Sequence, residues 1–340
     1  MQISPHDQNL LRIFKVQKNS LMKYLLTLCL IYASLIGYSQ ECTEISLLQK
    51  PGVWKEGMKG SVSGIPATDL EKEKKVVASL HNFIKSKYAP MGVEVDFNGS
   101  YDRPDPEMTV NNYDYNILFL HYFCEAKMVK ISPETSTAFS IAVNRFDGKI
   151  YETPDENNTS GEGFYSLKNI PAEKDGCFYF EENASLGFGI SGKSRSWLIT
   201  RDGKLPYSYV NKKEFLEKQK LMLSKALPEA ATGTQQNYQT ALTKIETLLK
   251  MPAGDLNQPA IVRQDPKDYL SYLFTTDDDP FGKVLIKPNP GYFNVKLSRS
   301  APQFFVVNLT GNEKEVIAAK AMTDIMKDFD FAALRNMLGK

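Results

Sequence analysis

The stretch that most constrains the fold is residues 196–223, where a strand pattern, a tight turn and a helix start follow one another. The run Trp197–Thr200 predicts a strand, and Asp202-Gly203 suits a tight hairpin turn because glycine tolerates positive φ. Asn211 then opens a charged segment, and its side chain is suited to cap the first turn of a helix. Upstream the sequence is aromatic and β-rich, and downstream it is helix-rich. The stretch therefore predicts a junction between two kinds of architecture.

The first 39 residues have the pattern of a secretory signal peptide. Lys23 precedes the apolar run Tyr24–Ala33, and the small residues Gly37 and Ser39 suit a cut before Gln40. The competing interpretation is a membrane anchor, but the run is shorter than the roughly 18–20 apolar residues that a spanning helix needs. We therefore expect cleavage, a mature chain without a transmembrane segment, and a secreted or periplasmic location.

Export would place the remaining cysteines in an oxidising compartment. Three cysteines follow the expected cut, namely Cys42, Cys124 and Cys177. Two of them could form a disulfide there and leave one thiol over. The sequence does not show which two pair, and three buried thiols are the alternative.

Composition and charge argue against one class of partner. The chain has 340 residues, of which 42% are hydrophobic and 24% charged, as in an ordinary globular protein. Its net charge is +1 and becomes −2 without residues 1–39, because that segment holds four basic residues and one acidic residue. No basic block stands out, so we expect no nucleic-acid partner.

The patterns along the chain predict an α+β fold in two regions. In residues 40–210 a helix that begins near Thr68 precedes an antiparallel β-meander. The longest strand, Tyr113–Met128, is apolar on both faces in its middle and is expected at the centre of the sheet. Residues 211–340 are helix-rich with a few strands, and two helices on either side of Pro228 are expected to form an αα-hairpin. No linker rich in Pro, Gly or Ser separates the regions, so we expect them to pack together.

The most conspicuous motif resembles a nucleotide-binding loop but lacks the sequence context that such a loop needs. Residues Gly187–Ser194 fit both G-x-G-x-x-G and the phosphate-loop pattern G-x-x-x-x-G-K-S. Phosphate binding in such a loop requires a helix that begins at Gly-Lys-Ser, so that its N–H groups face the phosphate. A strand-like run, Arg195–Thr200, follows instead. We interpret the segment as a glycine-rich turn between strands and expect no nucleotide.

No catalytic or metal-binding constellation stands out in the sequence. His81 and His121 are the only histidines after residue 39, and neither has a second ligand at metal-binding spacing. Asp277–Asp279 and Asp155-Glu156 do not match a calcium loop, and we interpret them as turn acids. We therefore expect no cofactor and no metal. A pair of catalytic carboxylates stays open, because a sequence does not give the separation between two acids.

Aromatic residues near loops and strand ends are the strongest candidates for a binding surface. We single out Tyr207, Tyr209, Tyr292 and Phe293. Aromatic side chains at such places serve recognition in many proteins. The alternative is that they cover the core beneath the loops.

Three short blocks resemble uncharacterised secreted proteins of Gram-negative bacteria. They are the export signal ending Tyr38-Ser39-Gln40, the block Trp197–Tyr207 and the block Asn289–Phe293. The resemblance covers a small part of the chain and implies a location but no activity. Together with the other features, the sequence predicts an exported, non-catalytic protein that binds a macromolecular or cell-envelope partner. The alternative is a secreted hydrolase that uses carboxylates on a glycan or peptide substrate.

Overall fold

The computed structural model describes residues 42–102, 109–145, 151–152, 164–167, 170–187 and 189–340. These residues divide into two compact units. The small unit comprises the described residues up to Lys50 together with Phe123–Lys130, and the large unit comprises the described residues of Pro51–Tyr122 and Ile131–Lys340. The predicted signal peptide and the acids Asp155-Glu156 lie outside the described residues.

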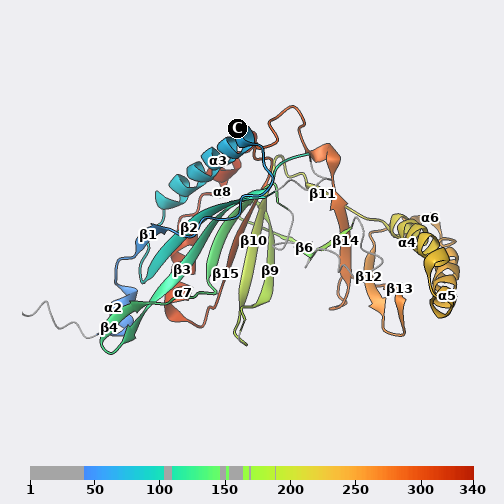
Figure 1. Cartoon of the computed structure of the whole chain (residues 1–340), viewed down its shortest axis with the longest axis horizontal. Helices are drawn as coiled ribbons and strands as arrows, with labels where there is room; N and C mark the ends of the chain where they lie inside the picture. The colour runs from blue at the N-terminus through green and yellow to red at the C-terminus, as the bar shows by residue number, and fades with distance from the viewer. Residues whose placement is uncertain (1–41, 103–108, 146–150, 153–163, 168–169, 188) are drawn as a thin grey trace, which may run out of the picture. The chain divides into compact units, whose positions relative to one another are not determined.

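A nine-stranded sheet has the order β1-β2-β3-β5-β15-β10-β9-β8, and β4, which lies mostly in the small unit, pairs with β3 (Figure 1). Only β1 and β2 are parallel neighbours along this order. Because β3 pairs with β2 on one side and β5 on the other, the expected central strand is confirmed. The strands are β1 Val53–Glu56, β2 Val93–Tyr101, β3 Tyr113–Glu125, β4 Met128–Ile131, β5 Ala138–Val143, β8 Ala172–Lys174, β9 Cys177–Ser185, β10 Ser191–Ile199 and β15 Phe305–Gly311.

One face of this sheet is apolar and carries three helices. Tyr115, Ile117 and Phe119 of β3 point to this face and are buried. The helices are α3 (Ala67–Lys85), α7 (Val316–Lys327) and α8 (Phe331–Arg335), and α3 and α7 lie along the sheet in Figure 1. His81 of α3 contacts this face directly, because its Nδ1 lies 3.0 Å from the Tyr115 hydroxyl.

A six-stranded sheet completes the large unit, in the order β13-β12-β14-β7-β6 with β11 paired to β14. Its central strand β14 has two buried faces. Val284 and Ile286 share a core cluster with Leu198 and Val306, which point to the face of the nine-stranded sheet opposite the helices. Leu285 points into a second cluster. The strands are β6 Tyr151–Glu152, β7 Tyr165–Leu167, β11 Tyr207–Tyr209, β12 Ile261–Asp265, β13 Asp268–Phe274 and β14 Lys283–Pro288.

Helices α4 (Lys212–Ala226) and α5 (Thr232–Leu248) cover the second cluster, and the short α6 (Ala253–Leu256) follows them. Apolar side chains of α4 and α5 pack together there, and Lys220 pairs with Glu246 across the two helices at 2.8 Å. The predicted αα-hairpin is confirmed. The predicted cap is confirmed too, because the Asn211 Oδ1 atom accepts a hydrogen bond from the Glu214 backbone N–H at 2.8 Å.

Residues 196–223 carry the chain from one sheet to the other. Asp202 and Gly203 both have positive φ, 56° and 65°, which confirms the tight turn. The turn does not form a hairpin, however, because the next strand, β11, pairs with β14 and not with β10. Burial of Tyr207 in the cluster between the sheets accounts for this placement.

Both sheets combine strands from the two regions that the sequence suggested. β15 lies between β5 and β10, and β6 and β7 belong to the sheet of β14. The expected boundary near residue 210 therefore divides the sequence but not the sheets. The predicted α+β class is confirmed, because mostly antiparallel sheets and separate helices make up the fold.

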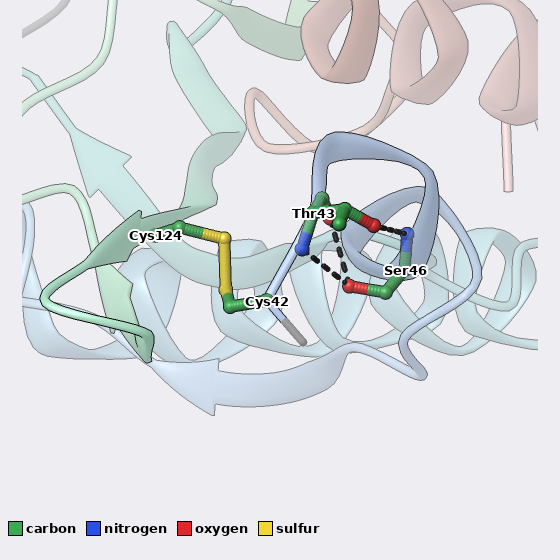
Figure 2. The surroundings of a disulfide bond; sticks show 4 residues. All are labelled: Cys42, Thr43, Ser46 and Cys124. Carbon is green, nitrogen blue, oxygen red and sulfur yellow. Dashed lines mark hydrogen bonds between the residues drawn. A yellow bond between two sulfur atoms is a disulfide. The ribbon is translucent and has the colours of Figure 1, made fainter. Parts of the chain in front are cut away.

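A disulfide between Cys42 and Cys124 links the two segments of the small unit (Figure 2). Helix α2 (Glu44–Leu48) follows Cys42, and Thr43 and Ser46 cap its start reciprocally. Cys177 lies in the large unit as a buried free thiol. The structure thus selects one of the pairings that the sequence left open.

Candidate functional site

A groove of about 440 Å³ lies on the helix-bearing face of the nine-stranded sheet, next to α7. We call it the Arg195 groove. Its floor is apolar and its rim is charged. The floor residues are Trp197, Leu309, Ala319, Met322 and Met326, and the charged residues are Lys174, Glu181, Arg195, Glu313 and Lys327.

Strand alternation builds the floor of the groove. Arg195 and Trp197 are two residues apart on β10 and therefore point to the same face. Trp197 is 3% exposed, and its ring centroid lies 5.2 Å from that of Tyr179 and 5.6 Å from that of Phe331. Its indole Nε1 donates a hydrogen bond to Asp175 Oδ2 at 3.2 Å. Trp197 thus forms a rigid, buried part of the floor, whereas the flexible thioether of Met326 gives the floor an adaptable surface.

Arg195 joins two acids at one side of the groove. Its Nε donates to Glu181 Oε2 at 3.2 Å, and its Nη2 pairs with Glu313. Glu181 also accepts a hydrogen bond from the Tyr179 hydroxyl at 2.5 Å and pairs with Lys193 at 3.4 Å. The hydrogen bond from Tyr179, followed by those from Arg195 and Lys193, lowers the pKa of Glu181 to about 2. Glu181 is therefore ionised at neutral pH and is already engaged by cations.

Two lysines at the rim lack such partners. Lys174 Nζ lies 4.4 Å from the centre of the Tyr179 ring, and both Lys174 and Lys327 are exposed. Neither ammonium group pairs with a carboxylate in the described part of the chain. The groove therefore offers an apolar floor flanked by two ammonium groups that are not neutralised.

The substitution Tyr179→Phe is expected to raise the pKa of Glu181 from about 2 toward its ordinary value of 4.5, because it removes the hydrogen bond with the largest effect. Carboxyl ¹³C NMR titration would measure this pKa. The matched control is Tyr209→Phe on β11, which lies outside the groove. A pKa that stays near 2 in Tyr179→Phe would contradict the assigned cause.

The four aromatic residues predicted to bind a partner lie elsewhere. Tyr207 and Phe293 are 2% and 8% exposed in the cluster between the sheets, and Tyr292 packs against that cluster. The Tyr292 hydroxyl donates to the Gln303 carbonyl at 2.7 Å. Tyr209 is 40% exposed. The structure brings Tyr207, Tyr292 and Phe293 together in the core, and a binding role for the four stays a prediction.

The glycine-rich segment that matches the phosphate-loop pattern forms a turn between β9 and β10, as expected. Gly187 and Gly189 have φ of 86° and 75°, and the Ile190 N–H donates to the Gly187 carbonyl at 2.9 Å. β10 begins at Ser191, so Lys193 and Ser194 lie in a strand and not at a helix start. This is not the backbone geometry of a phosphate loop.

The histidines hold separate positions in the structure. His81 stacks on Phe97 with ring centroids 4.0 Å apart, and burial lowers its pKa. His121 lines a hollow of about 240 Å³ together with Glu134 and Glu315. Glu315 caps α7 by accepting hydrogen bonds from the Ile317 and Ala318 N–H groups. Within the described ranges, no group of three or more metal-donor side chains lies together.

A buried acid lies between α3 and the chain around residue 300. Glu73 has no exposed surface, and its Oε1 accepts hydrogen bonds from Asn111 Nδ2 at 2.7 Å and from Ser300 Oγ at 3.2 Å. The same Asn111 amide lies 3.4 Å from Asp69 Oδ2. Burial raises the pKa of Glu73. The carboxylates of Glu73 and Asp69 thus both approach the Asn111 side-chain amide. Because Glu73 is fully buried, a substrate could reach it only if the fold opened.

The substitution Glu73→Gln is expected to stabilise the protein at neutral pH. The pKa of Glu73 is higher in the folded protein than in the unfolded chain. The stability that protonated Glu73 contributes is therefore complete below its pKa in the unfolded chain. This contribution is lost as the pH rises through its pKa in the folded protein. Glutamine keeps the oxygen acceptor and carries no charge, so the gain over Glu73 should grow with pH. Urea unfolding between pH 4 and 8 measures this, with exposed Glu71→Gln as the control. A loss of stability that is equal at every pH would contradict it.

Sequence reasoning singled out none of the rim residues of the groove. Lys174 and Glu181 lie on β8 and β9, while Glu313 and Lys327 come from the C-terminal end of the chain. Side chains alternate between the two faces of a strand, so the sequence of β10 does predict that Arg195 and Trp197 lie on the same face. The pairing of β10 with β15, which brings α7 to this face, has no local signal in the sequence.

No family model, curated protein or solved structure matches the chain, so its function is inferred from the geometry described above.

Proposed function

We propose that the protein is an exported, non-catalytic protein that binds an apolar, acidic segment of a cell-envelope or secreted partner protein in the Arg195 groove. The observation that carries the proposal is the apolar floor flanked by Lys174 and Lys327, for which the described residues supply no carboxylate partner. Apolar contact would supply affinity, and the ammonium groups would select for acidic residues and speed association.

The chemistry of the groove favours a protein segment over a glycan. Sugars stack on the open faces of aromatic rings, whereas Trp197 is almost completely buried. The accessible floor instead includes Met326, and methionine adapts to apolar side chains of different shapes. An extended or helical peptide with apolar and acidic side chains matches both parts of the groove.

Two features support a location outside the cytoplasm. The disulfide Cys42–Cys124 is the kind of bond that persists in oxidising compartments. The N-terminal sequence has the pattern of a cleaved export signal. Among the helices of the described residues, none combines the length and the apolar character needed to cross a membrane.

The hydrolase alternative has less support. Both acids of the groove, Glu181 and Glu313, are bound to Arg195, so neither is placed to hold or accept a proton for a reaction. Glu73 has the raised pKa that a general acid needs, but it is fully buried.

A selection from a displayed peptide library against residues 40–340 tests the proposed function. Enriched peptides are expected to combine apolar residues with Asp or Glu. Charge reversal in Lys174→Glu/Lys327→Glu should weaken their binding by about tenfold, which corresponds to about 1.4 kcal/mol. The control is Lys204→Glu/Lys225→Glu, which changes two exposed lysines outside the groove. Peptides without acidic residues, or equal binding by the two double variants, would refute the proposal.

A further inference from the structure

A second cavity, of about 420 Å³, lies where the end of β10 meets the β8–β9 turn and α8. We call it the Arg335 cavity. It shares no lining residue with the Arg195 groove. Its volume lies in the range that small-molecule sites occupy in proteins.

A guanidinium group with unused donors lines the cavity. Arg335 Nη2 donates to the Gly176 carbonyl at 2.5 Å and lies 3.5 Å from the Cys177 sulfur. No carboxylate pairs with Arg335 in the described part of the chain. A guanidinium carries five N–H donors in a planar fork that matches a carboxylate, so donors remain for a ligand.

The rest of the lining combines apolar and acidic residues. Phe178 is half-buried and supplies apolar surface, while the lining residues Leu198 and Thr200 are buried. The acids Glu173 and Asp202 also line the cavity, and both side chains are exposed. Arg335 thus provides one positive group, the two acids provide negative groups, and apolar surface completes the lining.

We propose that the Arg335 cavity binds a free α-amino acid with an apolar side chain. The carboxylate of the ligand would accept hydrogen bonds from Arg335, and its ammonium group would face Asp202 and Glu173. The apolar side chain would pack against the half-buried ring of Phe178. Charge complementarity selects this class, because a simple anion would meet two uncompensated carboxylates and a simple cation would meet the guanidinium.

Leucine, N-acetyl-leucine and leucinamide test the charge pattern, because each analogue removes one of the two charges. Isothermal titration calorimetry on residues 40–340 should show leucine binding at least tenfold more tightly than either analogue. Thermal unfolding gives an independent readout. Leucine is expected to raise the melting temperature, and the two analogues at the same concentration are not.

Variants of the cavity provide the second arm. Arg335→Gln should weaken leucine binding at least tenfold, and Asp202→Asn/Glu173→Gln should remove the preference for leucine over N-acetyl-leucine. If Arg335→Gln does not fold, Arg335→Lys provides a second test. It keeps the positive charge but lacks the paired N–H donors of the planar guanidinium, so it should still weaken leucine binding. Equal affinity for the three compounds, no binding of leucine at millimolar concentration, or unchanged binding in the Arg335 variants would overturn the proposal. Peptide binding in the Arg195 groove is measured separately, so failure of one site does not decide the other.

Discussion

Loss of the Cys42–Cys124 disulfide is expected to lower the free energy of unfolding by about 2–4 kcal/mol. The bond joins residues 82 positions apart in the sequence. A cross-link that closes so long a loop restricts the unfolded chain and so favours the folded state. Urea unfolding of residues 40–340 with and without a reductant measures the difference.

Two variants separate the disulfide from other effects of a reductant. Cys42→Ser/Cys124→Ser should have the stability of the reduced wild-type protein both with and without the reductant. Cys177→Ser removes the buried free thiol and should keep the full response. A wild-type protein whose stability does not change on reduction would contradict the expected contribution of the bond.

Features that depend on near neighbours in the sequence were predicted well. The cap at Asn211 needs a side chain and an N–H group three residues apart. The turn at Asp202-Gly203 needs two residues that tolerate positive φ. The apolar middle of β3 marks a strand with neighbours on both sides. Each of these signals lies within one short segment, so the sequence displays it directly.

Features that depend on distant pairing were not predicted. The insertion of β15 between β5 and β10 joins segments from both ends of the chain. The path of the chain after Asp202-Gly203 depends on β14, which comes much later in the sequence. The choice of Cys42 and Cys124 depends on where the end of β3 lies. In each case the deciding partner is set by packing of the whole fold.

The candidate site likewise combines features that depend on near neighbours in the sequence with features that depend on distant pairing. Alternation on β10 places Arg195 and Trp197 on one face, and this follows from the sequence alone once β10 is recognised as a strand. That this face is the one beside α7 follows from burial of the apolar side of the sheet under helix residues such as Met322 of α7. The lack of carboxylate partners at Lys174 and Lys327 is a property of the assembled groove.

Asn144→Ala is expected to cost about 3–5 kcal/mol of stability, because the Asn144 side chain joins three segments that are far apart in the sequence. Its Nδ2 donates to the carbonyls of Asn111 and Ala301 at 3.2 and 3.0 Å, and its Oδ1 accepts from the Gln303 N–H at 2.7 Å. The residue is fully buried, so alanine would leave these backbone groups without their partner and away from water. Urea unfolding measures the loss.

Backbone strain adds to this cost and can be separated from it. Asn144 has φ of 54°, a conformation that asparagine and glycine tolerate better than alanine. Asn144→Gly lacks the side-chain hydrogen bonds but relieves the strain, so it should be more stable than Asn144→Ala by about 1 kcal/mol. Because Gln303 lies just before β15 and Asn144 just after β5, the loss should affect the nine-stranded sheet as a whole. An alanine variant within about 1 kcal/mol of wild type would show that the contacts of Asn144 do not hold these strands in place.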